Sequence, residues 1–230
     1  KNGRSYFAAE ENALPVTAAT DADVETLRIY GEHPFFTLLQ QRAALQWPRL
    51  RVEQRPALPG LGPAVQINEA FTVSVTDGRT ASQLAELTAA DAFVVDVALN
   101  YADTAYLVAA HNRHASAANK ALFLRLLHTA IPQVEFIKDS PALIVARVLS
   151  SLINESVIMV ESGVCSREDI DVAAVAGVNY ADGIFGWLDN LGEKNVRTTL
   201  SNLAQLLHAA RYAPHYTLLH AAQPALTTTP

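Results

Sequence analysis

The chain has 230 residues, half of them hydrophobic, and a formal net charge of −6 at pH 7 from 17 basic and 23 acidic side chains. This is enough material for one large domain or two small ones. The acidic balance argues against nucleic acid or an anionic membrane as the main partner. No apolar run reaches the ~18 residues of a spanning helix, and no signal peptide is recognisable. The single cysteine, Cys165, cannot form an internal disulfide, so we expect a reducing, cytoplasmic location.

The first part of the chain alternates short β-rich runs with helical segments. Glu10–Thr20 is polar and alanine-rich, and Arg55–Pro63 carries three prolines and two glycines, so both are typical of connections. The predicted strands are Thr26–Tyr30, Arg49–Gln54, Phe71–Thr76, Ala92–Val97, Ala105–Ala110 and Val134–Lys138, and the predicted helices are Pro34–Leu45, Thr80–Ala89 and Ala115–Ala130. This order predicts a small α/β domain with a mostly parallel sheet and helices on its faces.

The segment after the first strand stands where a dinucleotide-binding domain has its phosphate loop. That loop needs G-x-G-x-x-G so that the backbone can turn tightly and approach the pyrophosphate. Here the six residues are GEHPFF, Gly31–Phe36. The carboxylate of Glu32 would repel a pyrophosphate, and Pro34 removes an amide donor from the helix N-terminus. We therefore predict that this domain does not bind NAD.

A second turn, TDGRT at Thr76–Thr80, lies at the carboxyl end of a predicted strand, where open α/β sheets bind ligands. It allows two interpretations. It is an anion-binding turn in which Arg79 and the helix amides face a phosphate, or Asp77 and Gly78 simply turn the chain and Thr80 begins a helix. The histidines His33, His114 and His128 share no spacing with cysteines or acids that would build a metal site, so no metal is expected.

The last part of the chain is helical. Apolar residues are so dense over Pro141–Met159 that this helix must be covered on most sides, by other helices or by a second subunit. Ser166 with Asp169 three residues later predicts a capped helix N-terminus, the alternative being a catalytic use of these acids. Gly177 is expected to end that helix, and Val196–Ala210 is a second amphipathic helix. The tail HAAQPALTTTP is expected to fray.

The run from Lys138 to Gly192 resembles the C-terminal helical domain of the 3-hydroxyacyl-CoA dehydrogenases. The family pattern is K-D-S-P-G-F-x-x-N-R, then N-E-A, then a glycine, S-x-x-D-I-D and G-x-x-Y-P-x-G-P-x-E-L-x-D-x-x-G. The residues in register are Lys138, Asp139, Ser140, Pro141, Arg147, Asn154, Glu155, Gly163, Ser166, Asp169, Ile170, Asp171, Gly177, Tyr180, Gly183, Asp189 and Gly192. The departures are Ala146 for the asparagine that helps hold the substrate, Ala181 and Ile184 for two prolines, and Gly186 for an acid.

The resemblance implies a fold that is α/β plus all-α. A linker from a preceding domain is expected over 1–20, a degenerate Rossmann-like parallel sheet over 21–140, and a helical domain over 141–230. The opening KNGRSYF is similar to the family's K-x-G-x-G-F-Y tail. We therefore expect the C-terminal portion of a longer two-repeat enzyme, of the phenylacetate-degradation or 3-hydroxybutyryl-CoA dehydrogenase type.

The looser resemblance before Lys138 implies one vestigial catalytic residue. LVAAHN at Leu107–Asn112 stands where the family has a strand leading into H-F-F-N-P, so His111 would be the relic of the catalytic histidine. The glutamate that should orient it is not recognisable, and a catalytic histidine needs such a partner. The alternative is an ordinary histidine at a strand end.

Three hypotheses remain open. The first is that the chain is an inactive part of an NAD-dependent 3-hydroxyacyl-CoA dehydrogenase, binding no cofactor itself and contributing homodimer contacts or a wall of the acyl-CoA site. The second is a self-sufficient enzyme of altered cofactor use, which requires a pocket that gathers His111, Asp77 and Arg79. The third is a non-catalytic module for CoA or an adenine nucleotide, with Arg79, Lys138 and Arg147 contacting phosphates.

Overall fold

The computed structural model describes residues 23–220. The predictions for Glu10–Thr20, for the opening KNGRSYF and for the tail beyond residue 220 lie outside this range. The described chain forms two compact units. The sheet unit comprises residues 23–74, 81–95 and 101–139, and the helical unit comprises 75–80, 96–100 and 140–220. The loops that follow two of the strands therefore belong to the helical unit.

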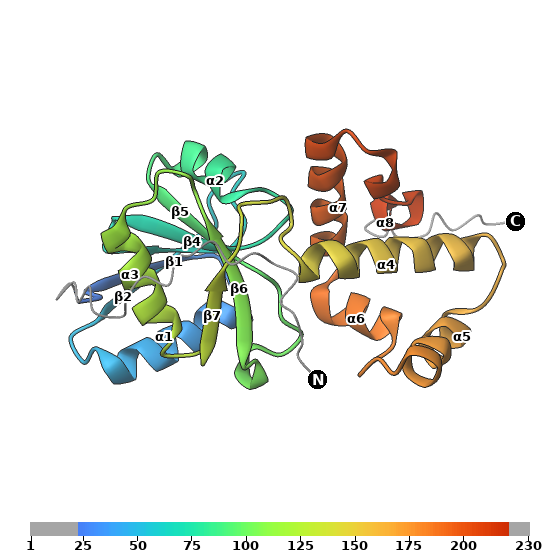
Figure 1. Ribbon diagram of the computed structural model, residues 1–230, viewed down its shortest axis with the longest axis horizontal. Helices are drawn as coiled ribbons and strands as arrows, with labels where there is room; N and C mark the ends of the chain where they lie inside the picture. Colours follow the sequence, from blue (N-terminus) through green and yellow to red (C-terminus); the bar gives the residue numbers. More distant parts are fainter. Residues whose placement is uncertain (1–22, 221–230) are drawn as a thin grey trace, which may run out of the picture. The chain divides into compact units, whose positions relative to one another are not determined.

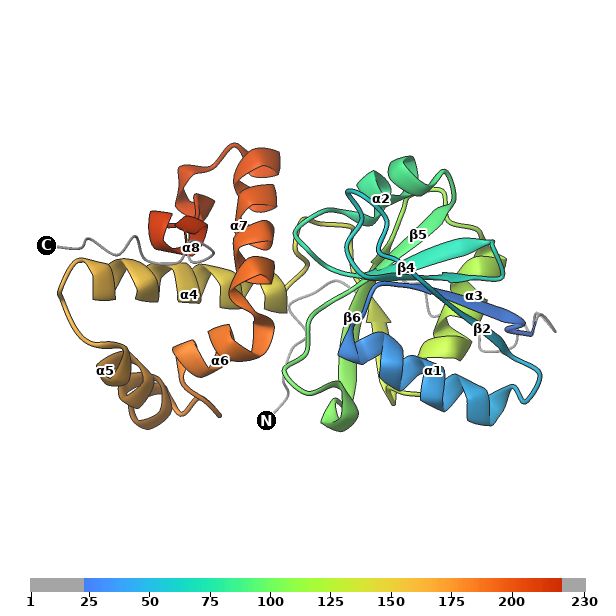
Figure 2. The ribbon, with the colours of Figure 1, turned by 180° about the vertical axis from the view of Figure 1, so that it is seen from behind.

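The sheet unit is built on seven strands in the order β2-β1-β3-β4-β5-β6-β7. The strands are β1 Thr26–Tyr30, β2 Arg51–Arg55, β3 Ala64–Ile67, β4 Phe71–Val75, β5 Asp91–Val95, β6 Tyr106–His111 and β7 Gln133–Phe136. The helices are α1 Pro34–Gln46, α2 Ala81–Thr88 and α3 Ala117–Leu127. Helices α1 and α3 lie side by side on one face of the sheet, and α2 lies on the other (Figures 1 and 2).

The expectation of a mostly parallel sheet was wrong, because the sheet is mixed. Strand β1 pairs with β2 in parallel and β6 pairs with β7 in parallel, but the β1–β3, β3–β4 and β5–β6 pairs are antiparallel. The sequence analysis missed β3, which a three-residue turn joins to β4. Asn68 and Glu69 in that turn have φ of 49° and 57°. A turn this short can join only antiparallel strands.

Aromatic rings make up much of the core of the sheet unit. Phe93 of β5 stacks on Phe123 of α3 with ring centroids 4.4 Å apart, and it meets Phe71 of β4 edge-on at 5.0 Å. All three side chains are fully buried. Because each comes from a different element, this cluster fixes α3 on β4 and β5.

The helical unit contains α4 Val145–Glu161, α5 Arg167–Val172, a π-helical turn over Ala173–Gly177, α6 Ile184–Leu191, α7 Glu193–Leu207 and α8 Tyr216–His220. Helix α4 is the longest and contacts both α6 and α7 (Figure 1). Leu149, Ile153 and Val157 recur every four residues along α4 and are buried in this core.

Several helix boundaries differ from the prediction. Helix α4 begins at Val145 rather than Pro141, because Ala142 and Leu143 adopt left-handed φ values of 59° and 49° in the preceding turn. Gly177 does not act as a left-handed cap, since it ends the π-helical turn and Asn179 has the positive φ, 59°. Helix α7 ends at Leu207, where His208 is left-handed at φ 48°.

Candidate functional site

The first amides of α1 are engaged within the chain. Pro34 has no N–H, and the N–H of Phe35 donates to Nδ1 of His33 at 3.2 Å. The amides of Phe36 and Thr37 donate to the carbonyl of His33 at 3.0 and 3.2 Å. Burial lowers the pKa of His33 to about 4. The imidazole is therefore neutral at pH 7 and can accept the Phe35 hydrogen bond.

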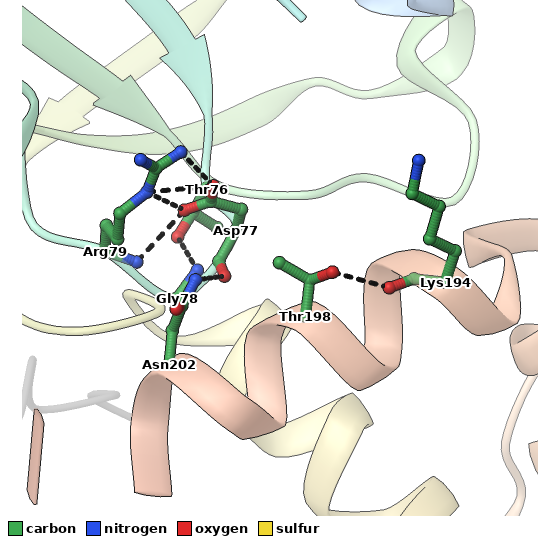
Figure 3. A network of polar contacts seen from close by, with 7 residues as sticks. All are labelled: Thr76, Asp77, Gly78, Arg79, Lys194, Thr198 and Asn202. Carbon is green, nitrogen blue, oxygen red and sulfur yellow. Dashed lines mark hydrogen bonds and ion pairs between the residues drawn. The ribbon is translucent and has the colours of Figure 1, made fainter. Parts of the chain in front are cut away.

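The Thr76–Thr80 turn is held against α7 within the helical unit (Figure 3). Asn202 Nδ2 donates to the carbonyl of Asp77 at 2.9 Å. A Cβ on Gly78 would stand 2.8 Å from both the carbonyl oxygen of Thr199 and Cβ of Asn202, and Gly78 has φ of +103°. Only glycine combines this backbone conformation with so close an approach.

Arg79 already has an anionic partner. Its Nε lies 3.1 and 3.0 Å from the two carboxylate oxygens of Asp77. The side chains of Arg79 and Asp77 are 17% and 26% exposed, so the pair is largely shielded from water. The cation that the sequence offered for a phosphate is therefore engaged within its own turn. Figure 3 also shows the hydroxyl of Thr198 donating to the carbonyl of Lys194, one turn earlier on α7.

The carboxylate of Asp139 occupies the N-terminus of α2. It accepts the N–H of Ala81 at 2.8 Å, and the N–H and hydroxyl of Ser82 at 2.9 and 2.8 Å. Both residues belong to the sheet unit. The aspartate of the K-D-S-P motif thus takes the place that an anion would occupy at this helix. The geometry favours the turn interpretation of Thr76–Thr80 over the anion-binding one.

Asp96, which the sequence analysis did not single out, plays the same part at α4. Its carboxylate accepts the N–H groups of Ile144, Val145 and Ala146 at 2.9, 2.7 and 3.0 Å, and that of Val97 at 2.9 Å. The residue is fully buried. Burial raises its pKa, although the four amide donors act in the opposite direction. The available signal was a lone acid directly after the apolar run Ala92–Val95.

The acids of the S-x-x-D-I-D motif are structural as well. Ser166 and Asp169 form a reciprocal capping box at the start of α5, which confirms the capping interpretation. Asp171 accepts the N–H of Phe185 at 2.9 Å in the first turn of α6. A Cβ on Gly183 would stand 2.2 Å from Cγ of Asp171. With Asp171 in this position, residue 183 must therefore be a glycine.

Asn154 of the N-E motif is 2% exposed and secures the segment before α8. Its side-chain amide donates to the carbonyl of Ala213 at 3.0 Å, and its oxygen accepts the N–H of His215 at 2.8 Å. Both of its polar groups thus have backbone partners in the helical unit. This places Asn154 among the structural residues of the motif.

The other proposed site residues fall in both units of the chain. His111 is the last residue of β6, with its ring edge-on to Phe136 at 5.0 Å and its Nδ1 2.9 Å from the carbonyl of Asn112. Lys138 is exposed, and Arg147 donates through Nε and Nη2 to the carbonyl of Pro141 at 3.2 and 2.7 Å. His111 belongs to the sheet unit, whereas Asp77 and Arg79 belong to the helical unit.

Within residues 23–220, no group of three or more His, Cys, Asp or Glu side chains is arranged to hold a metal ion. In the same range, no helix has both the length and the apolar character needed to cross a bilayer.

Two family models match the chain in succession. The 3-hydroxybutyryl-CoA dehydrogenase reduced Rossmann-fold domain matches residues 73–141, and the 3-hydroxyacyl-CoA dehydrogenase C-terminal domain matches residues 143–224. A curated relative, 3-hydroxyadipyl-CoA dehydrogenase from Escherichia coli K12, is 33% identical over 139 residues, which is 60% of this chain and 28% of that protein. Two successive stretches of the chain, residues 73–141 and 143–224, therefore match domains of the 3-hydroxyacyl-CoA dehydrogenase family.

Solved structures agree with this assignment. The crystal structure of 3-hydroxybutyryl-CoA dehydrogenase from Escherichia coli K12 superposes with a TM-score of 0.64 at 27% identity, covering 69% of this chain and 33% of that one. FadB2 from M. tuberculosis has the same fold, with a TM-score of 0.56 at 16% identity, and the match covers 82% of this chain and 62% of that one. The chain spans about a third of the length of the more similar E. coli relatives, and the expectation of a partial C-terminal region is supported.

Proposed function

We propose that this chain is the C-terminal part of an NAD-dependent 3-hydroxyacyl-CoA dehydrogenase, that it is not catalytic by itself, and that it supports assembly or closes the acyl-CoA site. The whole enzyme would oxidise a 3-hydroxyacyl-CoA to the 3-oxoacyl-CoA, with NAD bound elsewhere in the longer protein. The observation that carries the proposal is the N-terminus of α1, where Pro34 has no amide and the amides of Phe35 and Phe36 bond to His33. This supports the expectation that NAD does not bind at this helix.

The experiment is a set of three measurements on the 230-residue chain. Calorimetric titrations with NADH and with acetoacetyl-CoA measure binding, and an assay of NADH oxidation with acetoacetyl-CoA measures turnover. We expect neither NADH binding nor turnover. Acetoacetyl-CoA binding without turnover would indicate either a role on the substrate side of the enzyme or the alternative of a CoA-binding module. Micromolar NADH binding would refute the proposal that the N-terminus of α1 does not accept a pyrophosphate.

The assembly role is supported by the surface of the helical unit. Helix α5 has no buried residue, and the π-helical turn after it buries only Ala174. Val172, Val175 and Val178 on this segment are 66%, 46% and 61% exposed. Ile170 of α5 packs, partly buried, against the helical core, but the neighbouring exposed valines are apolar side chains of the kind that mark contact surfaces. We infer that a second copy of the chain covers this face in a homodimer.

The homodimer is tested by sedimentation equilibrium. Val172→Lys together with Val175→Lys should shift the chain to monomer, because two charges would be buried at the contact. The matched control is Leu45→Lys, which changes a side chain 79% exposed on α1 of the sheet unit and should leave the mass unchanged. A dimer that survives the double substitution would exclude this face.

The free Cys165 suits the reducing cytoplasm in which we place the enzyme.

A further inference from the structure

The helical unit contains two Asp–Gly dipeptides, Asp77–Gly78 and Asp182–Gly183. Such a dipeptide is chemically reactive, because no Cβ shields the glycine nitrogen from the carboxyl group of the preceding aspartate. The nitrogen can attack that carboxyl group when the folded chain holds the two groups together, and the attack is suppressed when the chain holds them apart. The two dipeptides differ in this respect.

At Asp182 the carboxyl group and the glycine nitrogen are in contact. The N–H of Gly183 donates to Oδ1 of Asp182 at 2.8 Å. Gly183 is the N-cap of α6, so its N–H lies outside the hydrogen-bond ladder of the helix. No helical hydrogen bond therefore has to break before this nitrogen reacts. Asp182 itself is exposed, so water reaches its carboxyl group.

Gly186 allows the carboxyl group of Asp182 to take this place. A Cβ on Gly186 would stand 2.7 Å from both carboxylate oxygens and 2.8 Å from Cγ of Asp182. A methyl group at position 186 would thus displace the carboxyl group from the first turn of α6. The contact between Asp182 and Gly183 can therefore be altered without changing either residue of the dipeptide.

At Asp77 both reacting groups are engaged elsewhere. The carboxylate accepts the Nε–H of Arg79 at 3.1 and 3.0 Å, and it accepts the backbone N–H of Arg79 at 3.1 Å. The N–H of Gly78 donates to Oγ1 of Thr76 at 3.3 Å. Attack of the Gly78 nitrogen on Asp77 would require these hydrogen bonds to break. A single hydrogen bond to a charged group is enough to slow such a step about tenfold.

We propose that Asp182 is a site of spontaneous isomerisation to isoaspartate and that the fold protects Asp77 from the same reaction. The nitrogen of Gly183 forms a bond to Cγ of Asp182 and loses its proton, while the bond from Cγ to the hydroxyl of the protonated carboxyl group breaks. One water molecule leaves, and a five-membered succinimide remains. The reaction needs no cofactor, oxidant or second protein, so it does not depend on the proposed dehydrogenase role.

Hydrolysis of the succinimide has two outcomes. One water molecule adds, and it breaks the bond from the nitrogen either to Cγ or to the main-chain carbonyl carbon. The first outcome restores Asp182. In the second outcome the main chain continues through Cβ and Cγ, so it is one methylene longer, and the main-chain carbonyl becomes the free carboxylate of isoaspartate.

The longer main chain would disturb the start of α6. Asp171 lies so close to Gly183 that a Cβ on the glycine has no room, and its Oδ1 accepts the N–H of Phe185 at 2.9 Å. An additional methylene before Gly183 would shift both contacts. Ile184 and Phe185, which follow it, are each 5% exposed and belong to the core of the helical unit. We therefore expect isoaspartate at position 182 to lower the free energy of unfolding.

The test is peptide mapping by mass spectrometry after incubation of the 230-residue chain at neutral pH and physiological temperature. Trypsin separates the two dipeptides, because Arg79 and Arg167 lie between Asp77 and Gly183. In the folded chain we expect isoaspartate to form at position 182 at least about tenfold faster than at position 77. In guanidinium chloride the two rates should become similar, because the contacts that distinguish the two dipeptides are lost.

A substitution outside the dipeptide tests the geometry directly. Gly186→Ala should lower the rate at Asp182 and leave the rate at Asp77 unchanged, because the new Cβ displaces the Asp182 carboxyl group. Alanine is a better helix former than glycine, so the variant should fold. The matched control is Gly177→Ala in the same unit, where a Cβ has nothing within 4 Å, and it should isomerise as the parent chain does.

Three results would overturn the proposal. They are equal rates at the two positions in the folded chain, no isoaspartate at position 182 while the denatured chain forms it, and an unchanged rate at Asp182 in Gly186→Ala. Circular dichroism checks that the variants fold. If Gly186→Ala does not fold, Arg79→Ala replaces it: this variant should accelerate isomerisation at Asp77, and an unchanged rate there would refute the protection.

Discussion

Replacing Gly78 with alanine should lower the free energy of unfolding more than replacing any other described glycine of positive φ. The φ of +103° at Gly78 is costly for a residue with a Cβ, by about 1–2 kcal/mol. The added Cβ would also meet the Thr199 carbonyl and Asn202 Cβ at 2.8 Å, and overpacking of this kind costs about 1–3 kcal/mol more. The expected loss is therefore about 2–5 kcal/mol.

The matched control for this substitution is Gly163→Ala in the same unit. Gly163 also has a positive φ, +69°, but a Cβ there has nothing within 4 Å. It should lose only the conformational part, about 1–2 kcal/mol. Urea unfolding followed by far-UV circular dichroism measures both variants against the parent chain. Equal losses for the two glycines would refute the contact between the Thr76–Thr80 turn and α7.

Three further predictions concern the caps. Since burial lowers the pKa of His33 from 6.5 to about 4, the unfolded chain binds more protons between these values. The stability that comes from keeping His33 neutral is fully present above pH 6.5. It is lost as the pH falls toward 4, and the loss reaches about 3 kcal/mol. His33→Asn keeps a capping acceptor without a titrating group, so it should lack this pH dependence when urea unfolding is measured at pH 7 and pH 4.5. The same change in unfolding free energy between the two pH values in both proteins would contradict the prediction. Asp139→Ala should destabilise the chain by about 1–2 kcal/mol through loss of the α2 cap, measured by thermal unfolding against Glu86→Ala, which changes an exposed acid on the same helix. A loss no larger than that of the control would argue against the cap. Gly183→Ala should cost less when Asp171→Ala is already present, because the Cβ clash is with that side chain; strictly additive losses in a double-mutant cycle would exclude the coupling.

Local patterns in the sequence were sufficient for most of the secondary structure. The six predicted strands and three predicted helices of the sheet unit all overlap observed elements, and the strand Thr26–Tyr30 is reproduced at both ends. The capping box of Ser166 and Asp169 was also predictable, because its two hydrogen bonds join residues three apart. The motif between Lys138 and Gly192 was enough to identify the family, which the comparisons support.

The roles of the motif residues were decided only by the tertiary structure. Asp139 caps a helix that begins 58 residues earlier, and Asp96 caps one whose capped amides begin 48 residues later. No periodicity links such positions, since the chain between them folds into other elements. The direction of each strand pair was also decided only by the tertiary structure, because the hydrophobic pattern of a strand does not depend on which way its neighbour runs.

The sequence by itself therefore determined the elements, the family and the loss of the glycine-rich loop at Gly31–Phe36. The structure decided that the acids resembling functional residues are largely helix caps, and that Arg79 is bound by Asp77. The physical reason is that a carboxylate satisfies helix N-terminal amides wherever the fold places it nearby. Sequence spacing predicts such a cap only when the donor and the acceptor lie in the same turn of the chain.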